Sequence, residues 1–423
     1  MMQFLMFSKS QINKILSNKS AIFVGLSLFA AGINYLYYPA MSHIMSVNDF
    51  GASQALITIL TQAGSVFAGL SLLTIYLVKV VDSKKIASII NSIQKIIVAI
   101  LILATIILAS MHSLVSSFLN INDNLNIIIV ALDLIVSIPF VISYGYLLAK
   151  KRFMSAGLLQ ICVVSVKLLT GVTMAYKFGV IGAIAGVGVG YIMGIATFWC
   201  ICKLFKFETW EFNIISSYRL PSKKDILLVK PYAKTVLAIL VISTCLVIYP
   251  SCDVIVARHS LSGNVSGLYA AASTLSSIVL FASLPLVNTL TPYLNLDNIK
   301  KSISHIKKTM LWITGIGLSS ILILIIFPRF LLSIFGSEYI AYANILWIFG
   351  LNMLLICLLN VILQVIALYK PLMGLALAIL GVAIGYCLAS IYNTSALSII
   401  TSFAITYAAI FVAGIILTRR FAK

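Results

Sequence analysis

Residues 309–328 read TMLWITGIGLSSILILIIFP, an uninterrupted run of twenty residues without a charge. An α-helix of about 20 apolar residues is long enough to cross the roughly 30 Å hydrocarbon core of a bilayer. Lys307 and Lys308 precede the run and Arg329 follows it, so charges stand only at its two ends. This stretch therefore predicts a transmembrane helix.

Similar runs recur along all 423 residues, of which 61% are hydrophobic and only 9% are charged. We count twelve, at 20–44, 50–79, 91–111, 125–149, 154–176, 180–203, 231–255, 265–293, 309–328, 340–368, 371–391 and 395–418. Soluble domains carry about 25% charged residues, so this composition excludes a soluble enzyme, a secreted disulfide scaffold and a disordered chain. The sequence predicts an all-α polytopic membrane protein with about twelve transmembrane helices.

Basic residues outnumber acidic residues by 29 to 10, and the loops share them unevenly. If both termini lie on one side, 25 basic residues fall on that side and only Lys177, Arg258 and Arg329 on the other, while Lys167 lies inside a span. Lysine and arginine are enriched in cytoplasmic loops. We therefore expect both termini in the cytoplasm, and we attribute the net charge of +19 to membrane topology rather than to a nucleic-acid partner.

The sequence also contains an internal repeat. A shift of 216 residues places Gly51 on Gly267, Ala55 on Ala271, Thr58 on Thr274 and the pair Lys84-Lys85 on Lys300-Lys301, which we expect in a loop between helices. A repeat of six helices keeps both halves in the same orientation across the membrane. We expect two parallel six-helix lobes, residues 1–215 and 216–423, around a central cavity.

Polar residues within the spans are the first candidates for a transport pathway. Gln54, Thr58, Thr61 and Ser65 are spaced i, i+4, i+7 and i+11 and so share one helix face. Further uncharged candidates for the cavity wall are Asn34, Gln160, Asn352, Asn360 and Gln364. All of these side chains also fit an alternative role as interhelical hydrogen-bonding groups.

Four charged residues are candidates for substrate binding or ion coupling. Placing Lys167 inside a span costs about 3 kcal/mol, and binding an anionic headgroup would justify that cost; the alternatives are pairing with Asp133 or snorkelling. Asp133 and Asp253 are candidates for carrying H⁺ or Na⁺, and the alternative for Asp253 is a local pair with Arg258. We find no catalytic, P-loop or metal-ligand motif, which predicts a transporter with no catalytic residue, metal or cofactor.

Several short segments, taken in order, resemble a known family. They are Tyr37-Tyr38-Pro39, SVNDFG (46–51), YGYLLAKKRF (144–153), GLLQ (157–160), KLLTG (167–171), GVIGA (179–183), CDVIVA (252–257) and SGLYAA (266–271). Their order and spacing are similar to those of Wzx-type O-antigen flippases, within the multidrug/oligosaccharidyl-lipid/polysaccharide exporter superfamily.

The resemblance implies a flippase of the bacterial inner membrane that moves an undecaprenyl-diphosphate-linked oligosaccharide from the cytoplasmic to the periplasmic leaflet. It also implies membrane lipids and other polysaccharide assembly proteins as partners, with H⁺ or Na⁺ as a candidate coupling ion. Lys167 and Asp253 become cavity candidates by the same resemblance. The alternative is a cation-coupled multidrug and toxin extrusion antiporter of the same superfamily.

Overall fold

The computed structural model describes residues 19–64, 69, 73, 77, 83–121, 123–149, 152–204, 219–290, 294 and 299–422, and within them every regular element is a helix. The longer helices of the first half are α2 (Lys19–Ile44), α3 (Val47–Gly64), α5 (Ser83–Ser110), α7 (Leu125–Ala149) and α8 (Phe153–Leu204), with the short α6 (His112–Phe118). The short α10 (Lys223–Val229) opens the described part of the second half. The longer helices of the second half are α11 (Ala233–Ile248), α12 (Cys252–Ser260), α13 (Gly263–Ser276), α14 (Ile278–Leu290), α15 (Ile299–Ile326), α17 (Leu346–Tyr369), α18 (Pro371–Ile391) and α19 (Ala396–Ala422), with the short α16 (Pro328–Ser333).

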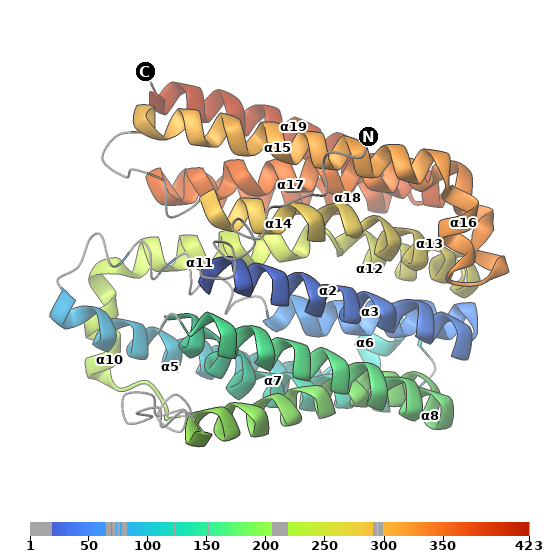
Figure 1. The fold of residues 1–423 in the computed structure, drawn as a ribbon, viewed down its shortest axis with the longest axis horizontal. Coiled ribbons are helices and arrows are strands. Elements are labelled where there is room, and N and C mark those ends of the chain that lie inside the picture. The colour runs from blue at the N-terminus through green and yellow to red at the C-terminus, as the bar shows by residue number, and fades with distance from the viewer. Residues whose placement is uncertain are drawn as a thin grey trace, which may run out of the picture.

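These helices confirm the predicted membrane fold. Nine helices among the described residues are long and apolar enough to cross a membrane. One of them, α8, folds back on itself at Gly179, where φ is 59° and ψ is −134°, and so supplies two of the predicted spans. Only glycine adopts such a backbone conformation without strain, which explains why the turn occurs at this residue (Figure 1).

Two predicted spans are each divided into two helices; the prolines inside them, Pro250 and Pro285, lead us to expect a kink in both. Within the span predicted at 231–255, α11 ends at Ile248 and a second helix, α12, begins at Cys252. The break lies at Pro250, which has no N–H to donate to the preceding turn. The span predicted at 265–293 is interrupted at Ser277, whose hydroxyl donates to the Ser273 carbonyl at 3.0 Å. A hydroxyl bonded back to its own helix in this way bends helices.

The paired lysines also lie elsewhere than predicted. Lys84 and Lys85 belong to α5, and Lys300 and Lys301 belong to α15, rather than to loops. At about 1.5 Å per residue, a 28-residue helix is about 42 Å long. Because this exceeds the hydrocarbon thickness, both helices continue beyond the apolar core at the end that carries the lysines.

The element boundaries reproduce the 216-residue repeat. Helices α3 and α13 begin at residues 47 and 263, α5 and α15 at 83 and 299, and α6 and α16 at 112 and 328. The first span of each half also ends at an equivalent place. In the first half α2 ends at residue 44, and in the second half α12, which completes the divided span, ends at residue 260. The two halves are therefore built on one plan.

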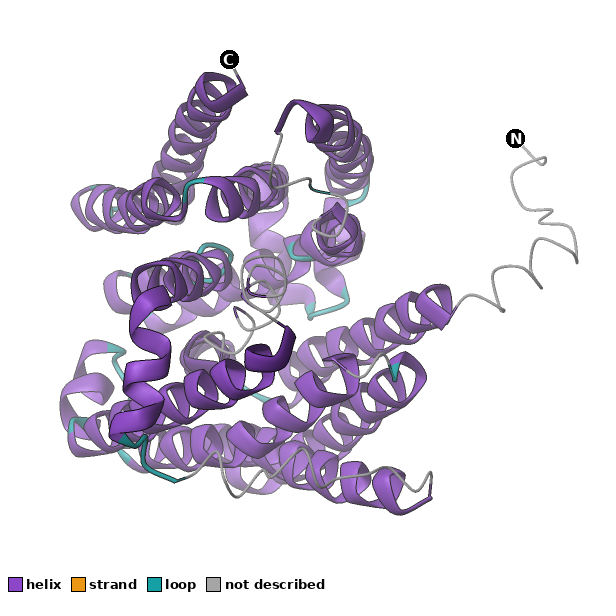
Figure 2. Cartoon of the chain, turned by 90° about the vertical axis from the view of Figure 1, so that its left-hand side faces the viewer, coloured by secondary structure: helices purple, strands orange, loops and turns teal. Residues whose placement is uncertain are grey.

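The helices form two lobes, which Figure 2 shows end-on as two groups. In one lobe α2 and α7 pack against α8 and α5 packs against α7, and in the other α11, α15, α18 and α19 pack around α17. Helices α3 and α13 join the lobes along their length. The expected boundary at residues 215 and 216 falls outside the described residues and stays a prediction.

We call the end of the molecule that carries Arg258 and Arg329 the outer end, following the charge distribution. It is the end of α6, α12 and α16, on the right in Figure 1, opposite α10 and the C-terminus.

Candidate functional site

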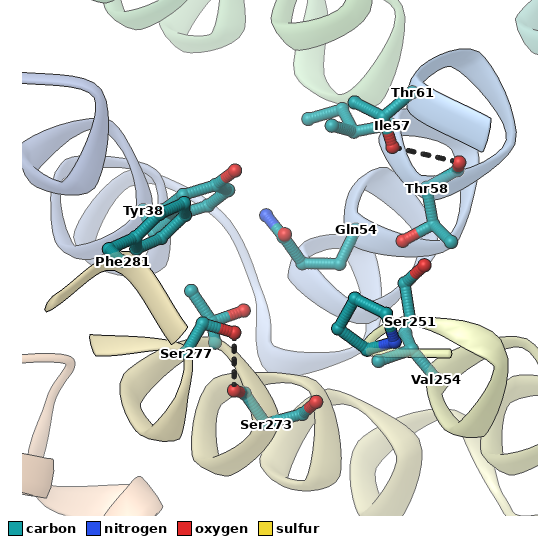
Figure 3. Close-up of a pocket in the computed structure, with 12 residues that line it drawn as sticks. Tyr38, Gln54, Ile57, Thr58, Thr61, Ser251, Val254, Ser273, Ser277 and Phe281 are labelled. Atoms are coloured by element: carbon teal, nitrogen blue, oxygen red, sulfur yellow. Dashed lines mark hydrogen bonds between the residues drawn. The ribbon is translucent and has the colours of Figure 1, made fainter. Parts of the chain in front are cut away.

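A cavity of about 110 Å³ lies between the two lobes (Figure 3). The first lobe contributes one residue of α2 and four of α3, and the second contributes residues of α12, α13 and α14 and of the breaks beside them. The lining residues are Tyr38, Gln54, Ile57, Thr58, Thr61, Pro250, Ser251, Val254, Ser273, Thr274, Ser277 and Phe281. We call this space the central cavity.

The polar groups of the central cavity are hydroxyls and one carboxamide, and none of its lining residues is charged. In Figure 3 the Gln54 side chain points toward Tyr38, across the space between α3 and α13. Its Nε2 has no hydrogen-bond partner among the described residues. A buried donor without a partner is costly, so this amide is available to a ligand.

Three of the predicted cavity residues lie together here, namely Gln54, Thr58 and Thr61. Ser65, the fourth member of the predicted stripe, falls outside the described residues. Ser251, Val254 and Phe281 were not among the predicted cavity residues, because a kink expected from proline does not say which side chains then face a cavity. Pro250 inside an apolar run was the signal that pointed to this region.

Lys167 lies behind the wall of the central cavity, inside the first lobe. Its side chain is only 8% exposed. Its ammonium donates to Asn34 Oδ1 at 2.9 Å and stands 4.3 Å from the ring centre of Tyr37 and 5.4 Å from that of Tyr38. Since Tyr38 lines the cavity, one aromatic side chain separates the cavity from a buried cation. The bond to Asn34 takes the place of the pairing with Asp133 that was the alternative.

Asp133 and Gln160 also lie within the first lobe and not in the lining of the central cavity. The Asp133 carboxylate packs directly against Gly188, where a Cβ would collide with it. Asp133 Oδ2 and Gln160 Oε1 have no hydrogen-bond partner among the described residues. Asp133 therefore keeps one oxygen for a proton or a cation, and Gln160 keeps one for a hydrogen-bond donor or a cation.

Asp253 stands directly behind the other wall of the central cavity and is 1% exposed. Its Oδ2 accepts hydrogen bonds from Tyr269 at 3.0 Å and from Ser273 at 3.2 Å, and its Oδ1 has no partner among the described residues. Ser273 lines the cavity, so Asp253 reaches the cavity through one hydroxyl. The local pair with Arg258 considered as an alternative is absent from the described contacts, because Arg258 bonds elsewhere.

The polar residues predicted on the tenth span lie inside the second lobe, on α17. Gln364 Nε2 donates to Asn360 Oδ1 at 2.8 Å, which matches the alternative role in helix packing. Asn352 is buried with both amide atoms unpartnered among the described residues. None of the three lines the central cavity.

Arg258 closes the outer end between the lobes and is 3% exposed. From α12 of the second lobe its guanidinium donates to two segments of the first: to Leu119 O at 2.9 Å and Asn120 O at 3.1 Å in one, and to Asn48 Oδ1 at 2.8 Å in the other. We call these four residues the outer latch. A planar guanidinium has five N–H groups, which allows one side chain to bridge several acceptors.

Further contacts reinforce this closure. His259 stacks on Phe118 with ring centres 4.1 Å apart, and its Nδ1 hydrogen-bonds the Phe118 carbonyl at 2.7 Å. Gly51 of α3 meets its repeat equivalent Gly267 of α13, where a Cβ on Gly51 would stand 2.8 Å from the Gly267 Cα. The two lobes are therefore in close contact at the outer end.

Solved transporter structures share this fold. An inward-facing multidrug resistance transporter of the MATE family of the MOP superfamily matches with a TM-score of 0.71 and 13% identity, over 92% of this chain and 94% of that chain. An outward-facing MATE transporter matches with a TM-score of 0.65 and 14% identity, over 96% of each chain. The lipid II flippase MurJ in an inward closed conformation matches with a TM-score of 0.68 and 14% identity, over 94% of this chain and 87% of that chain.

The chain thus has the fold of MOP superfamily transporters, a group of multi-pass membrane proteins that includes drug transporters and a lipid-linked-precursor flippase. No protein-family model and no curated protein matches the sequence.

Proposed function

We propose that this protein is a flippase that moves an undecaprenyl-diphosphate-linked oligosaccharide, an O-antigen or related polysaccharide repeat unit, to the periplasmic leaflet of the bacterial inner membrane. The observation that carries the proposal is the uncharged, hydroxyl- and amide-lined cavity between the lobes. Sugar hydroxyls exchange hydrogen bonds with such groups, and the rings of Tyr38 and Phe281 offer apolar faces to sugar C–H groups. The polyprenyl chain stays in the lipid.

The diphosphate needs a positive group, and Lys167 supplies it in this proposal. Its ammonium is held by neutral partners, Asn34 and the Tyr37 ring, so no carboxylate among its described contacts competes with a phosphate. Movement of Tyr38 would expose the ammonium to the central cavity.

The described conformation is a closed state in this mechanism. A space of about 110 Å³ holds roughly four waters at about 30 Å³ each and is too small for an oligosaccharide. Alternating access therefore requires the lobes to separate. Because the outer latch holds the outer end, the substrate enters from the cytoplasmic side and leaves after the latch opens.

Asp253 is the coupling site that we propose for H⁺ or Na⁺. Protonation or Na⁺ binding would weaken its hydrogen bond from Ser273, and Ser273 is part of the cavity wall. A multidrug antiporter is the alternative function, because the same fold serves drug transporters. A cationic drug is best held by a carboxylate in the cavity, and the described lining has none.

Deleting the gene and locating the lipid-linked glycan tests the proposal. We expect undecaprenyl-diphosphate oligosaccharide to accumulate in the cytoplasmic leaflet and surface polysaccharide to disappear, with both defects reversed by the wild-type gene. Gln54→Leu should fail to reverse them. Gly32→Ala is the control, since nothing lies within 4 Å of the position of its Cβ. Unchanged glycan together with raised sensitivity to cationic drugs would refute the flippase and favour the antiporter.

A further inference from the structure

A second cavity, of about 230 Å³, lies at the outer end of the first lobe beside the outer latch. Its polar lining consists of two carboxylates, three carboxamides and one guanidinium, from Asp49, Asp123, Asn48, Asn120, Asn126 and Arg258. The flippase proposal assigns no role to this space, which we call the outer cavity.

The side-chain oxygen of Asn126, in the lining of the outer cavity, is an acceptor with no hydrogen-bond partner among the described residues. The side chain is 4% exposed, and its Nδ2 donates to the Asp123 carbonyl at 3.0 Å. That bond sets the orientation of the amide and leaves Oδ1, which has no partner among the described residues. Burying an acceptor without a partner costs free energy, which a ligand bound to that oxygen would recover.

The two carboxylates add further oxygens. Oδ2 of Asp49 accepts from Ser46 at 2.8 Å, and Oδ1 of Asp123 accepts from the Leu125 N–H at 2.9 Å. Each carboxylate keeps its other oxygen clear of these described bonds. The groups that the outer cavity offers are therefore mainly acceptors, with two negative charges against the single positive charge of Arg258.

In the outer latch, three more oxygens of the same kind are hydrogen-bonded to Arg258. The guanidinium of Arg258 is bonded to two backbone carbonyls, of Leu119 and Asn120, and to Oδ1 of Asn48. Carboxylates, carboxamide oxygens and backbone carbonyls are the ligands that Ca²⁺ takes, six to eight at a time. In the closed state these oxygens are bonded to the guanidinium instead of to a hard cation.

We propose that the outer cavity is a binding site for a hard divalent cation, which competes with Arg258 and so favours opening of the outer latch. Withdrawal of Arg258 removes the nearest positive charge and frees its three acceptors, which then join Asp49, Asp123 and Asn126. A ligand that binds one state better shifts the population toward it. The polar atoms that the described lining offers to a cation are carboxylate and carboxamide oxygens, which suit an oxygen-preferring ion rather than a transition metal.

Calcium binding to the purified full-length protein, at constant ionic strength, tests the site. For the wild type we expect saturable binding with a Kd of about 10⁻⁴ to 10⁻³ M, the range of weak extracellular calcium modules. Arg258→Ala should bind at least tenfold more tightly, because the competing charge is gone. The double substitution Asp49→Asn and Asp123→Asn should bind at least tenfold more weakly.

Two matched controls separate the site from general surface charge. Arg329→Ala and Glu338→Gln remove exposed charges near the same end of the molecule, away from the residues that line the outer cavity, and should leave the calcium Kd unchanged. An Arg258→Ala protein that binds calcium no more tightly than the wild type would overturn the competition. Absence of saturable binding, or binding of a monosaccharide instead of calcium, would overturn the cation site.

The effect on the latch has its own readout. In a version with the native cysteines replaced, Ser251→Cys places a thiol in the central cavity. Calcium added outside should speed its labelling by a membrane-impermeant maleimide at least threefold, and a chelator should reverse the effect. Equal labelling rates with and without calcium would refute the coupling, and neither result depends on what the protein transports.

Discussion

At the scale of single residues, the buried charges are held by neutral partners. Lys167 bonds a carboxamide, Arg258 bonds carbonyl and carboxamide oxygens, and Asp253 accepts from hydroxyls. The salt bridge found among the described residues, Lys95 to Asp225 at 3.1 Å, lies at the end opposite the outer latch. Neutral partners hold a charge in place without cancelling it, so it still acts on a substrate or an ion.

Lys167→Met is expected to abolish transport without unfolding the protein. Methionine keeps most of the stem but removes the charge. Leaving Asn34 Oδ1 unpaired costs about 1–3 kcal/mol, while removing a lysine from a span recovers about 3 kcal/mol, so stability should change little. Complementation of the deletion strain should fall at least tenfold at normal protein levels. The exposed Lys177, changed to Ala, is the control, and full complementation by Lys167→Met would contradict a role for the charge.

Arg258→Ala should shift the protein toward an outward-open state. The substitution removes bonds to two segments of the first lobe and leaves carbonyl oxygens that water can satisfy once the end opens. Labelling of Ser251→Cys from outside should rise at least tenfold. Arg329→Ala, which removes an exposed arginine from the same end, should leave labelling at the wild-type rate. Unchanged labelling of the Arg258 variant would mean that the other outer contacts suffice.

At the scale of elements, the joint between the lobes is the α3–α13 pair. Its helices begin at repeat-equivalent residues and touch at repeat-equivalent glycines, Gly51 and Gly267. A pseudo-twofold axis must therefore pass between them. Small residues at a helix crossing let the two backbones approach closely.

Gly51→Ala is expected to destabilise this joint. The added methyl would meet the backbone of Gly267 at 2.8 Å, and overpacking of this kind costs about 1–3 kcal/mol. A lower thermal unfolding midpoint and faster outside labelling of Ser251→Cys should appear together. Gly32→Ala, in open space on α2, should leave both unchanged or raise the midpoint. If Gly51→Ala behaved in the same way, the close approach would have no mechanical role.

The sequence predicted the local part of this architecture. Apolar run lengths predicted the spans, and the lysine and glycine matches predicted the repeat that α3 and α13 then displayed. The outer latch was not predictable in this way, since Arg258 and its acceptors are separated by 138 to 210 residues. The kink at Pro250 was predictable, since proline has no N–H for the preceding turn. The break at Ser277 was not, because an apolar run has the same composition whether its helix is straight or bent.

At the scale of the whole molecule, charge and fold together predict orientation. Arg419 and Arg420 end α19, at the end opposite the outer latch (Figure 1). By the positive-inside rule we expect this end to lie in the cytoplasm.

Reporter fusions test that orientation. A cytoplasm-active reporter fused after Lys423 should be active, and a periplasm-active reporter inserted at Lys177, at the turn of α8, should also be active. Exchanging the two reporters should abolish both signals, and activity after exchange would reverse the assigned orientation and the direction of transport proposed here.

The partners of Arg258 also bear on how the closed state responds to its surroundings. Ordinary salt weakens attraction between exposed opposite charges over about 10 Å at 0.1 M. The guanidinium is buried, and its bonds run to uncharged oxygens. Changes in ordinary salt should therefore affect this barrier less than they would affect an exposed ion pair, whereas a cation that binds the oxygens themselves is expected to weaken it.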